Sequence, residues 1–498
     1  MENLQFKAGL WCDTINVADF VKTNITPYLG DASFLCGPSE RTMKVWNKCL
    51  EALEEERQRG GVRSLDQKTV STITSHGAGY IDRENELIVG LQTDELLKRA
   101  IKPFGGINVV SRACREQGVE VDEKVKDIFT HYRKTHNDGV FDVYTEEIRT
   151  FRSLGFLTGL PDNYARGRII GDYRRLALYG TERLIEAKKA DLQRLGSPMN
   201  DATIRLREEV AEQIKALKDI ATMGEFYGLD LTRPATSAQE AVQWVYMAYL
   251  AAVKEQDGAA MSLGNVSSFL DIYIQYDLDK GLINEEFAQE LIDQFVIKLR
   301  MVRHLRMQSY NDIFAGDPTW ITEAIGGRFN DGRTKVTKTS FRFLQTLYNL
   351  GPSPEPNMTV LWSPELPEGF KEFCAKVSID TSSIQYENDT LMREVRFSDD
   401  YGIACCVSYQ AIGQQIQFFG ARCNLAKALL LAINGGRCEN TGTVIVKGIP
   451  TLMGDLLNYE EVLSNYKKVL TEVARVYNDA MNIIHYMHDK YYYEKAQM

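Results

Sequence analysis

Two adjacent cysteines, Cys405 and Cys406, are the clearest candidates for chemistry in this 498-residue chain. A disulfide between neighbours closes a short, strained ring, so the pair is expected to act as thiols. One interpretation is two small apolar residues in a buried strand, where their side chains point to opposite faces. The other is a loop tip at which both thiols face a cavity and pass a group or an electron between them. Gly402 before the pair and Ser408 after it leave both interpretations open.

Two arginines are candidates for holding an anion, because a guanidinium presents a planar fork that matches a carboxylate. Arg168 lies in ARGRIIGDYRR, and Arg422 lies in QFFGARCN shortly after the cysteine pair. Either could instead be a surface or salt-bridged arginine. His76, in TITSHGAGY, is either an acid–base group or a turn residue. His485 and His488 lack a third ligand, so we expect structural histidines and no metal.

Composition excludes several classes of function. The chain has 58 Lys and Arg against 68 Asp and Glu, a net charge of −10, which is unfavourable for neutralising nucleic-acid phosphates. The densest apolar run, Leu425–Ile433, is too short to span a bilayer. The first residues show neither a basic nor an apolar signal region. Nine cysteines without CxxC spacing indicate reduced thiols. We therefore predict a cytoplasmic enzyme that binds neither nucleic acid nor membrane.

Long amphipathic helices are expected to dominate the first part of the chain, about residues 1–350. The stretch Asp201 to Met223 has helical periodicity. Ser237 and Glu240 have the spacing of a capping box, and Asn284 can cap the helix that follows. These helices have to position whatever the later chain contributes.

Short apolar strands alternate with helices in the later part, about residues 351–498. We expect strands at Asn357–Trp362, Ile403–Val407 and Thr443–Ile449, and helices at about 418–433 and 459–488. This alternation is typical of a parallel sheet buried on both faces. The prediction is an α/β, barrel-like fold with a helical N-terminal elaboration. The strands are too few to close a large barrel, so either the sheet is open or another chain completes it.

Several long segments together resemble the pyruvate formate-lyase family of glycyl radical enzymes. They are GLPDNYARGRIIGDYRRLALYG, GPSPEPNMTVLW, SIDTSSIQYEND, IACCVS and QFFGARCNLAK, and they occur in the family's order. The similarity runs from near residue 10 to the last helix. It implies a ten-stranded α/β barrel of two five-stranded parallel halves, here incomplete. Residues 1–498 would form one core domain, and the glycyl radical domain, with its RVSGYA-type motif, is absent.

The resemblance also implies an activity and a set of site residues. The activity is formate C-acetyltransferase: pyruvate and coenzyme A become acetyl-coenzyme A and formate. Cys406 would relay the radical, and Cys405 would add to the pyruvate carbonyl and become acetylated. Arg168 and Arg422 match the carboxylate-binding arginines. The matching pocket residues are Phe314, Trp320, Phe419 and Ala259, and the matching coenzyme A contacts are His76, Asn137 and Phe141.

Departures from the family pattern define the alternatives. Tyr409 and Gln410 change the end of the cysteine loop, and Ser153 stands where a lysine is expected near coenzyme A. The CCVS loop lacks the glutamate that follows the single cysteine of the diol dehydratases and choline lyase, which favours formate-lyase chemistry over elimination. The missing radical segment implies a split enzyme without a tightly bound cofactor. Its expected partners are a small glycyl radical subunit, a radical S-adenosylmethionine activating enzyme and a second core in a homodimer. The alternatives are a non-catalytic or regulatory relative, or a related enzyme acting on another 2-oxo acid such as 2-oxobutyrate.

Overall fold

The computed structural model describes most of the chain. The described ranges are 6–102, 107–132, 136–158, 168–196, 200–255, 260–314, 316–396, 398–417, 422–454 and 456–491, with the backbone alone at 136–138, 158, 168, 310, 313–314, 416–417 and 488–491. Within these ranges, no helix combines the length and the apolar character needed to cross a membrane.

A run of five parallel strands forms the centre of the molecule. Backbone pairing joins β4 to β5 and then β6 to β7 and β8, and a parallel bridge between Gly264 and Glu323 connects the two groups. The spatial order of the strands is therefore their order in the chain. The predicted parallel sheet is confirmed, and its five strands correspond to one half of the expected barrel. The strands are β4 (Arg168–Ile170), β5 (Met261–Ser262), β6 (Thr322–Gly326), β7 (Asn357–Trp362) and β8 (Ile384–Asn388).

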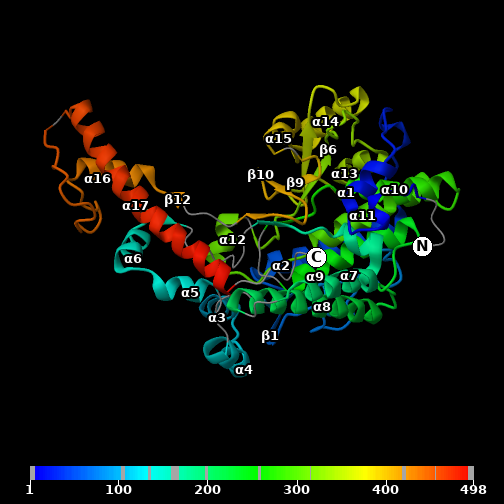
Figure 1. Cartoon of the computed structure of the whole chain (residues 1–498), viewed down its shortest axis with the longest axis horizontal. Coiled ribbons are helices and arrows are strands. Elements are labelled where there is room, and N and C mark those ends of the chain that lie inside the picture. The colour runs from blue at the N-terminus through cyan, green and yellow to red at the C-terminus, as the bar shows by residue number, and fades with distance from the viewer. Residues whose placement is uncertain are drawn as a thin grey trace.

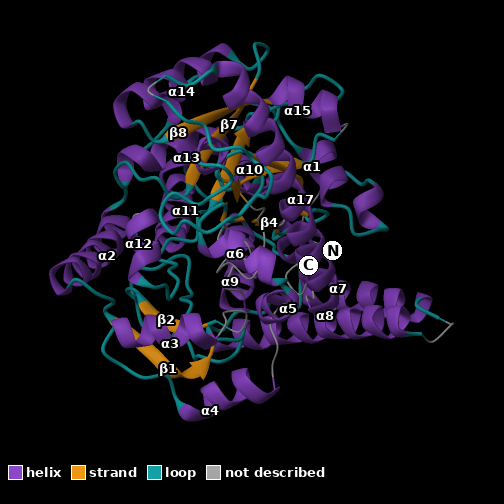
Figure 2. Cartoon of the chain, turned by 90° about the vertical axis from the view of Figure 1, so that its left-hand side faces the viewer, coloured by secondary structure: helices purple, strands orange, loops and turns teal. Residues whose placement is uncertain are grey.

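Helices connect the strands and cover the sheet (Figure 2). Three of them, α9, α10 and α11, are buried nearly all round, because they lie between the sheet and the outer helices. Asn265 caps α10, and Asn284 caps α11 as predicted. Ser237 accepts the N–H of Glu240, but the Glu240 carboxylate bonds the N–H of Thr236, so the predicted capping box is only half formed. The helices are α7 (Arg174–Arg194), α8 (Asp201–Phe226), α9 (Ala238–Glu255), α10 (Val266–Asp279), α11 (Glu285–Arg300), α12 (Gln308–Phe314), α13 (Lys338–Asn349), α14 (Glu368–Thr381) and α15 (Asp389–Arg396).

An antiparallel hairpin, β9 (Tyr401–Ala404) and β10 (Ser408–Ala411), packs against this sheet. The predicted strand Ile403–Val407 is wrong in its second half, because β9 ends at Ala404 and the chain turns through residues 405–407. Two short antiparallel pairings follow, β11 (Ile416–Gln417) with β4 and β12 (Arg422–Cys423) with β3 (Leu157–Thr158).

The N-terminal part packs on the helical side of the same hydrophobic core. Phe20 of α1 is fully buried there and makes an edge contact with Trp11. A separate parallel pair, β1 and β2, begins where α2 ends. The elements are the 3₁₀ helices Leu10–Cys12 and Ala32–Phe34, α1 (Val17–Asn24), α2 (Glu40–Arg59), β1 (Ser64–Val70), β2 (Lys98–Ile101), α3 (Ile107–Glu116), α4 (Glu123–Asp127) and the π-helix Ile128–Tyr132.

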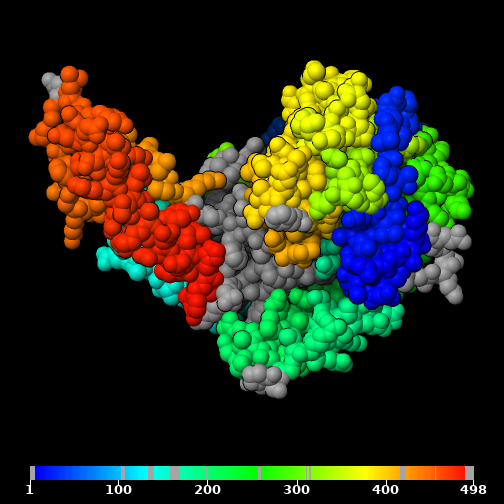
Figure 3. Space-filling view, turned by 45° about the horizontal axis from the view of Figure 1, so that its top comes forward, coloured from blue at the N-terminus to red at the C-terminus, as the bar shows by residue number. Residues whose placement is uncertain are grey.

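The C-terminal lobe has a core of its own, formed by α5 (His136–Val143), α6 (Glu146–Ser153), α16 (Leu425–Ile433) and α17 (Tyr459–Tyr491). It projects beside the main body, with α16 and α17 orange to red and α5 and α6 cyan in Figure 1, and with the orange and red part prominent in Figure 3. The predicted helix 459–488 is confirmed, whereas that at 418–433 begins only at Leu425. The predicted strand Thr443–Ile449 is wrong, because Gly442 and Gly448 adopt positive φ and bend the chain into turns.

Candidate active site at the cysteine hairpin

The cysteine pair occupies the tip of the hairpin. Ala404 of β9 faces Ser408 of β10, so Cys405, Cys406 and Val407 form a three-residue turn. Cys405 is half-buried and Cys406 is exposed. Cys405 adopts φ +62°, a left-handed conformation that is rare for a residue with a side chain. Of the two interpretations open from the sequence, the structure therefore supports the loop tip.

Polar side chains from four neighbouring strands hold the backbone of this tip. Ser262 Oγ accepts the N–H of Cys405 at 3.2 Å. The carbonyl of Cys405 accepts hydrogen bonds from two side chains, and the carbonyl of Cys406 accepts one. The four side chains are Ser262 of β5, Thr322 of β6, Asn357 of β7 and Gln385 of β8. These bonds fix the strained turn across one edge of the parallel sheet. A strained backbone conformation persists only where its surroundings hold it in this way.

A buried ion-pair network anchors the base of the hairpin to β4. Arg174 donates to both oxygens of Asp400, each at 2.9 Å, and to Asp172 at 2.7 Å. Asp172 follows β4 and Asp400 precedes β9. Burial by itself raises the pKa of Asp400, but the charge and hydrogen bonds of Arg174 lower it below its ordinary value. The hairpin therefore has a fixed position relative to the strand that carries Arg168.

Close packing places β9 directly on the sheet. A Cβ on Gly402 would lie 2.6 Å from the Cα of Gly264, so only glycine permits this approach. Tyr401 stacks on Tyr409 with ring centroids 4.8 Å apart, and its hydroxyl donates to Asp389 at 2.7 Å. Tyr409, a departure from the family pattern, thus packs on its neighbouring strand.

The predicted pocket residues differ in what the structure describes. Trp320 lies two residues before Thr322, at φ +51°, with the guanidinium of Arg306 5.3 Å from its ring centroid. Phe314 ends α12, and only its backbone is described. Ala259 and Phe419 lie outside the described residues. The pocket roles of these four residues stay predictions.

The two predicted carboxylate-binding arginines lie on different strands. Arg168 belongs to β4, next to β5, and only its backbone is described. Arg422 is exposed on β12, which pairs with β3 beside the C-terminal lobe, away from the hairpin (Figure 1). The structure does not bring Arg422 to the cysteines, and the roles of both arginines stay predictions.

The predicted coenzyme A contacts also come from separate elements. His76 is buried after β1, between Asp66 at 3.1 Å and the hydroxyl of Ser75 at 2.8 Å. Burial lowers the pKa of His76, against the opposing effect of Asp66. Phe141 lies on α5 in the C-terminal lobe, with Arg152 5.0 Å above its ring. Asn137, on the same helix, has only its backbone described.

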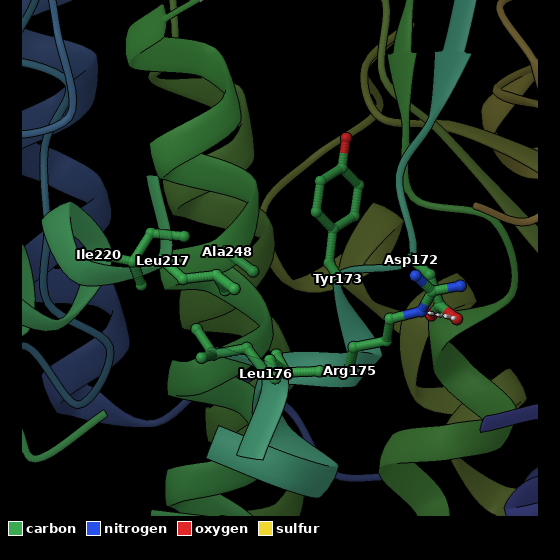
Figure 4. Close-up of a pocket in the computed structure, with 8 residues that line it drawn as sticks. Asp172, Tyr173, Arg175, Leu176, Leu217, Ile220 and Ala248 are labelled. Atoms are coloured by element: carbon green, nitrogen blue, oxygen red, sulfur yellow. Dashed lines mark ion pairs between the residues drawn. The ribbon is translucent and has the colours of Figure 1, made fainter. Parts of the chain in front are cut away.

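A small cavity lies at the start of α7, close to the ion-pair network but not at the cysteines (Figure 4). Its volume is about 10 Å³, which suits a single water molecule. Asp172 and Arg175 form an ion pair at its polar side, 3.4 Å apart. Its lining is otherwise apolar, from Leu176, Leu184, Leu217, Ile220 and Ala248. It is too small for an organic substrate.

The side chains that hold the hairpin could not be predicted from local sequence patterns. Asn357 could have been noticed as a polar residue at the start of an apolar strand, whereas Gln385 lies in a strand that is itself largely polar. Arg174 was one arginine among several in ARGRIIGDYRR, and Asp400 had no local signal because its partner is 226 residues away. Within the described residues, the cysteines form no disulfide and no group of side chains has the arrangement of a metal site.

Comparisons with known proteins agree with this geometry. The glycerol dehydratase of Clostridium butyricum matches with a TM-score of 0.74 at 21% identity, over 92% of this chain and 65% of that one. A glycyl radical enzyme from Archaeoglobus fulgidus matches with a TM-score of 0.67 at 17% identity, over 94% and 64%. The fold is therefore that of the glycyl radical enzymes, an α/β barrel.

The sequence comparison defines the family. The model of the pyruvate formate lyase-like family matches residues 10–498, so the chain belongs to that family. The formate acetyltransferase of Haemophilus influenzae is 55% identical over 498 residues, which cover 99% of this chain. The chain spans 65% of the length of that relative.

Proposed function

We propose that this chain is the core subunit of a formate C-acetyltransferase. In this proposal it converts pyruvate and coenzyme A to acetyl-coenzyme A and formate, and a separate small subunit supplies a glycyl radical. The observation that carries the proposal is the strained tip at Cys405 and Cys406, held by four strands of the sheet. The 55% identity to a formate acetyltransferase supports the same reaction.

The two thiols divide the chemistry. The glycyl radical of the partner would take a hydrogen atom from the thiol of Cys406. The Cys406 thiyl then takes the hydrogen atom of the Cys405 thiol, and the Cys405 thiyl adds to the carbonyl carbon of pyruvate. The bond from that carbon to the carboxylate breaks, which leaves an acetyl group on Cys405. The one-carbon fragment takes a hydrogen atom from Cys406 and leaves as formate, and the acetyl group passes to the thiol of coenzyme A.

Exposure fits this division of roles. Cys406 is exposed, as a thiol that exchanges a hydrogen atom with another chain has to be, and Cys405 is half-buried, as suits a site that excludes water. Arg168 and Arg422 are the proposed partners of the pyruvate carboxylate. His76, Asn137 and Phe141 are the proposed contacts of coenzyme A.

A partner chain is also favoured by the surface. Among the described strands none pairs with the outer edge of β8, and an open edge invites another strand. The C-terminal lobe exposes a group of apolar side chains, here called the lobe patch: Leu425, Leu429, Leu430, Val444, Met453, Leu456, Leu457 and Tyr459. Exposed apolar groups of this kind mark interaction sites. The activating radical S-adenosylmethionine enzyme and a second core are the further partners that we propose.

Reconstitution under strict anaerobiosis tests the proposal. The samples are the core alone, the core with a small glycyl radical subunit, and both with activating enzyme and S-adenosylmethionine. We expect formate and acetyl-coenzyme A only from the last sample, with pyruvate as substrate. Assays with 2-oxobutyrate show whether the enzyme also accepts this longer 2-oxo acid. Formate release by the core alone would contradict the split arrangement. A radical on the bound partner without formate would favour the non-catalytic alternative.

A further inference from the structure

A second cavity, of about 170 Å³, lies between α7 and α8 and adjoins the smaller one described above. Leu184, Lys188 and Asp191 line it from one face of α7, because residues at this spacing lie on the same side of a helix. Gln213 and Leu217, one turn apart on α8, form the opposite wall. No residue that lines the cavity belongs to the cysteine hairpin.

Two cationic side chains line this cavity, Arg175 and Lys188, and each makes one long ion pair among the described residues. Arg175 Nε lies 3.4 Å from Asp172, a carboxylate that Arg174 already bonds at 2.7 Å (Figure 4). Lys188 Nζ lies 3.9 Å from Asp191, whose side chain is 44% exposed. Ion pairs of this kind contribute little free energy, so both cations are incompletely neutralised.

The electrostatics of Lys188 agree with this geometry. Burial lowers the pKa of Lys188, Asp191 opposes that effect, and the charge of Arg175 adds to it. The two cations therefore repel each other across the same region. Burial raises the pKa of Glu209, the other carboxyl group that acts on Lys188, which weakens it as a counter-charge. An anion in the cavity would stabilise both cations.

Gln213 adds a requirement of a different kind. Its side chain lines the cavity and is 7% exposed, and its Oε1 is buried without a hydrogen-bond partner in the part of the chain that the structure describes. A buried amide oxygen without a donor is costly and uncommon in proteins. A hydroxyl group on a ligand in the cavity would supply the donor.

The size and the walls of the cavity limit the ligand further. A cavity of about 150 Å³ can hold a benzene ring, so this one admits a molecule of about six non-hydrogen atoms. Ile15, Leu184, Ala187 and Leu217 present apolar surface, which suits a short carbon chain. The side chains of Lys188 and Asp191 are partly exposed, so the ligand can enter from solvent.

We propose that this cavity binds a short hydroxycarboxylate. The carboxylate lies between Arg175 and Lys188, whose guanidinium fork and ammonium are suitable donors for it. The hydroxyl donates to Gln213 Oε1, and the carbon chain packs against the apolar wall. The assignment does not depend on the proposed reaction, because its residues are separate from the two thiols.

Ligand-observed NMR titrations of the full chain test the assignment with three probes. Lactate carries both groups, propionate carries the carboxylate alone, and propane-1,2-diol carries hydroxyls without a carboxylate. The variants are Lys188→Met and Gln213→Met, which keep the length of the side chain without its charge or its amide. The control is Lys189→Met, because Lys189 follows on α7 but is exposed and does not line the cavity.

The unaltered chain should bind lactate more tightly than propionate or the diol. Lys188→Met should weaken lactate and propionate about tenfold or more, as for a lost charge-assisted contact, and change the diol less than about twofold. Gln213→Met should weaken lactate about threefold to tenfold, as for a neutral hydrogen bond, and change propionate less than about twofold. Lys189→Met should alter none of the three. The melting temperature of Gln213→Met should not fall, because an unpartnered buried oxygen is removed.

Three results would overturn the assignment. If the unaltered chain does not bind lactate, the cavity holds solvent only. Equal affinities of Lys188→Met and Lys189→Met for lactate would place the carboxylate elsewhere. Equal losses of lactate and propionate in Gln213→Met would contradict the contact between the hydroxyl and the amide oxygen.

Discussion

At the scale of single residues, the conformation of Cys405 is the feature that most needs an explanation. A side-chain-bearing residue in the left-handed region costs of the order of 1–3 kcal/mol when the surroundings have to hold it there. Ser262, Thr322 and Asn357 supply that hold through the peptide groups of Cys405. These bonds all involve backbone atoms of Cys405.

A second residue, Glu323, gives a pH-dependent prediction. It is fully buried on β6, and its Oε1 accepts the N–H of Ser267 at 2.8 Å, whereas its Oε2 has no hydrogen-bond partner among the described residues. Burial raises its pKa to about 8 from an ordinary 4.5. The folded chain therefore holds a proton that the unfolded chain releases above pH 4.5, so stability should fall as pH rises from 4.5 to 8.

Glu323→Gln should remove most of that fall, which is of the order of 4 kcal/mol. The glutamine carbonyl can still accept the N–H of Ser267. The measurement is denaturant unfolding at pH 4.5 and pH 8.5, where the gain in stability of the variant over the unaltered chain should be larger at pH 8.5 by most of that amount. A parallel fall in both proteins would mean that Glu323 is ionised in the fold.

Asp293 on α11 is the matched contrast. Burial raises its pKa to about 7, but both of its oxygens accept N–H donors, from Gln289 at 2.9 Å and from Asn349 at 2.8 Å. In an asparagine at this position, the side-chain NH₂ group would face one of these N–H donors and lose a hydrogen bond. Asp293→Asn should therefore destabilise the chain by about 1–3 kcal/mol at the lower pH, where the carboxyl is protonated, and by less at pH 8.5, where the raised pKa already costs the unaltered chain stability.

At the scale of elements, the hairpin depends on Arg174 for its position. We expect Arg174→Lys to lower the free energy of unfolding by about 1–3 kcal/mol, since an ammonium lacks the planar fork that bonds both oxygens of Asp400 while a further N–H bonds Asp172. Amide hydrogen exchange should show faster opening of β9 and β10 in particular. The control is Arg175→Lys. Arg175 is partly exposed and lies 3.4 Å from Asp172, so its replacement should change the free energy of unfolding by less than about 1 kcal/mol. Equal effects of the two substitutions would contradict the anchoring role.

The sequence predicted those elements whose signals are local. Asn284 caps α11, β7 matches Asn357–Trp362, and α17 begins at Tyr459, because capping and periodicity act within a few residues. Thr443–Ile449 failed, since its apolar residues pack as turns against the lobe rather than pairing in a sheet.

Site prediction followed the same rule of locality. The cysteine pair was visible as an unusual dipeptide, and recognition of the family supplied roles for it. The groups that hold the pair could not be found, because Ser262, Gln385 and Arg174 reach it across more than twenty to more than two hundred residues. Such long-range contacts can be identified only when the topology of the fold is known.

At the scale of the whole molecule, the lobe patch is the surface expected to meet another chain. Leu456 is 92% exposed, so Leu456→Asp should leave the stability of the core unchanged within about 0.5 kcal/mol. It should weaken binding of the small subunit about tenfold or more, because a charge would have to be desolvated. Ile379→Asp is the control, 82% exposed on α14 in the main body. Titration calorimetry would contradict the prediction if both substitutions weakened binding equally.

In the proposed two-thiol reaction, the strained hairpin tip carries the acyl group. Mass spectrometry of the activated assembly, given trideuterated pyruvate without coenzyme A, tests it most directly. We predict a trideuteroacetyl group on Cys405 and none on Cys406, with formate released in equal amount, and removal of the label when coenzyme A is added. Cys406→Ser should leave Cys405 unlabelled, because the hydrogen atom has no relay. Formate production with no label on Cys405, or labelling that survives in Cys406→Ser, would contradict the account.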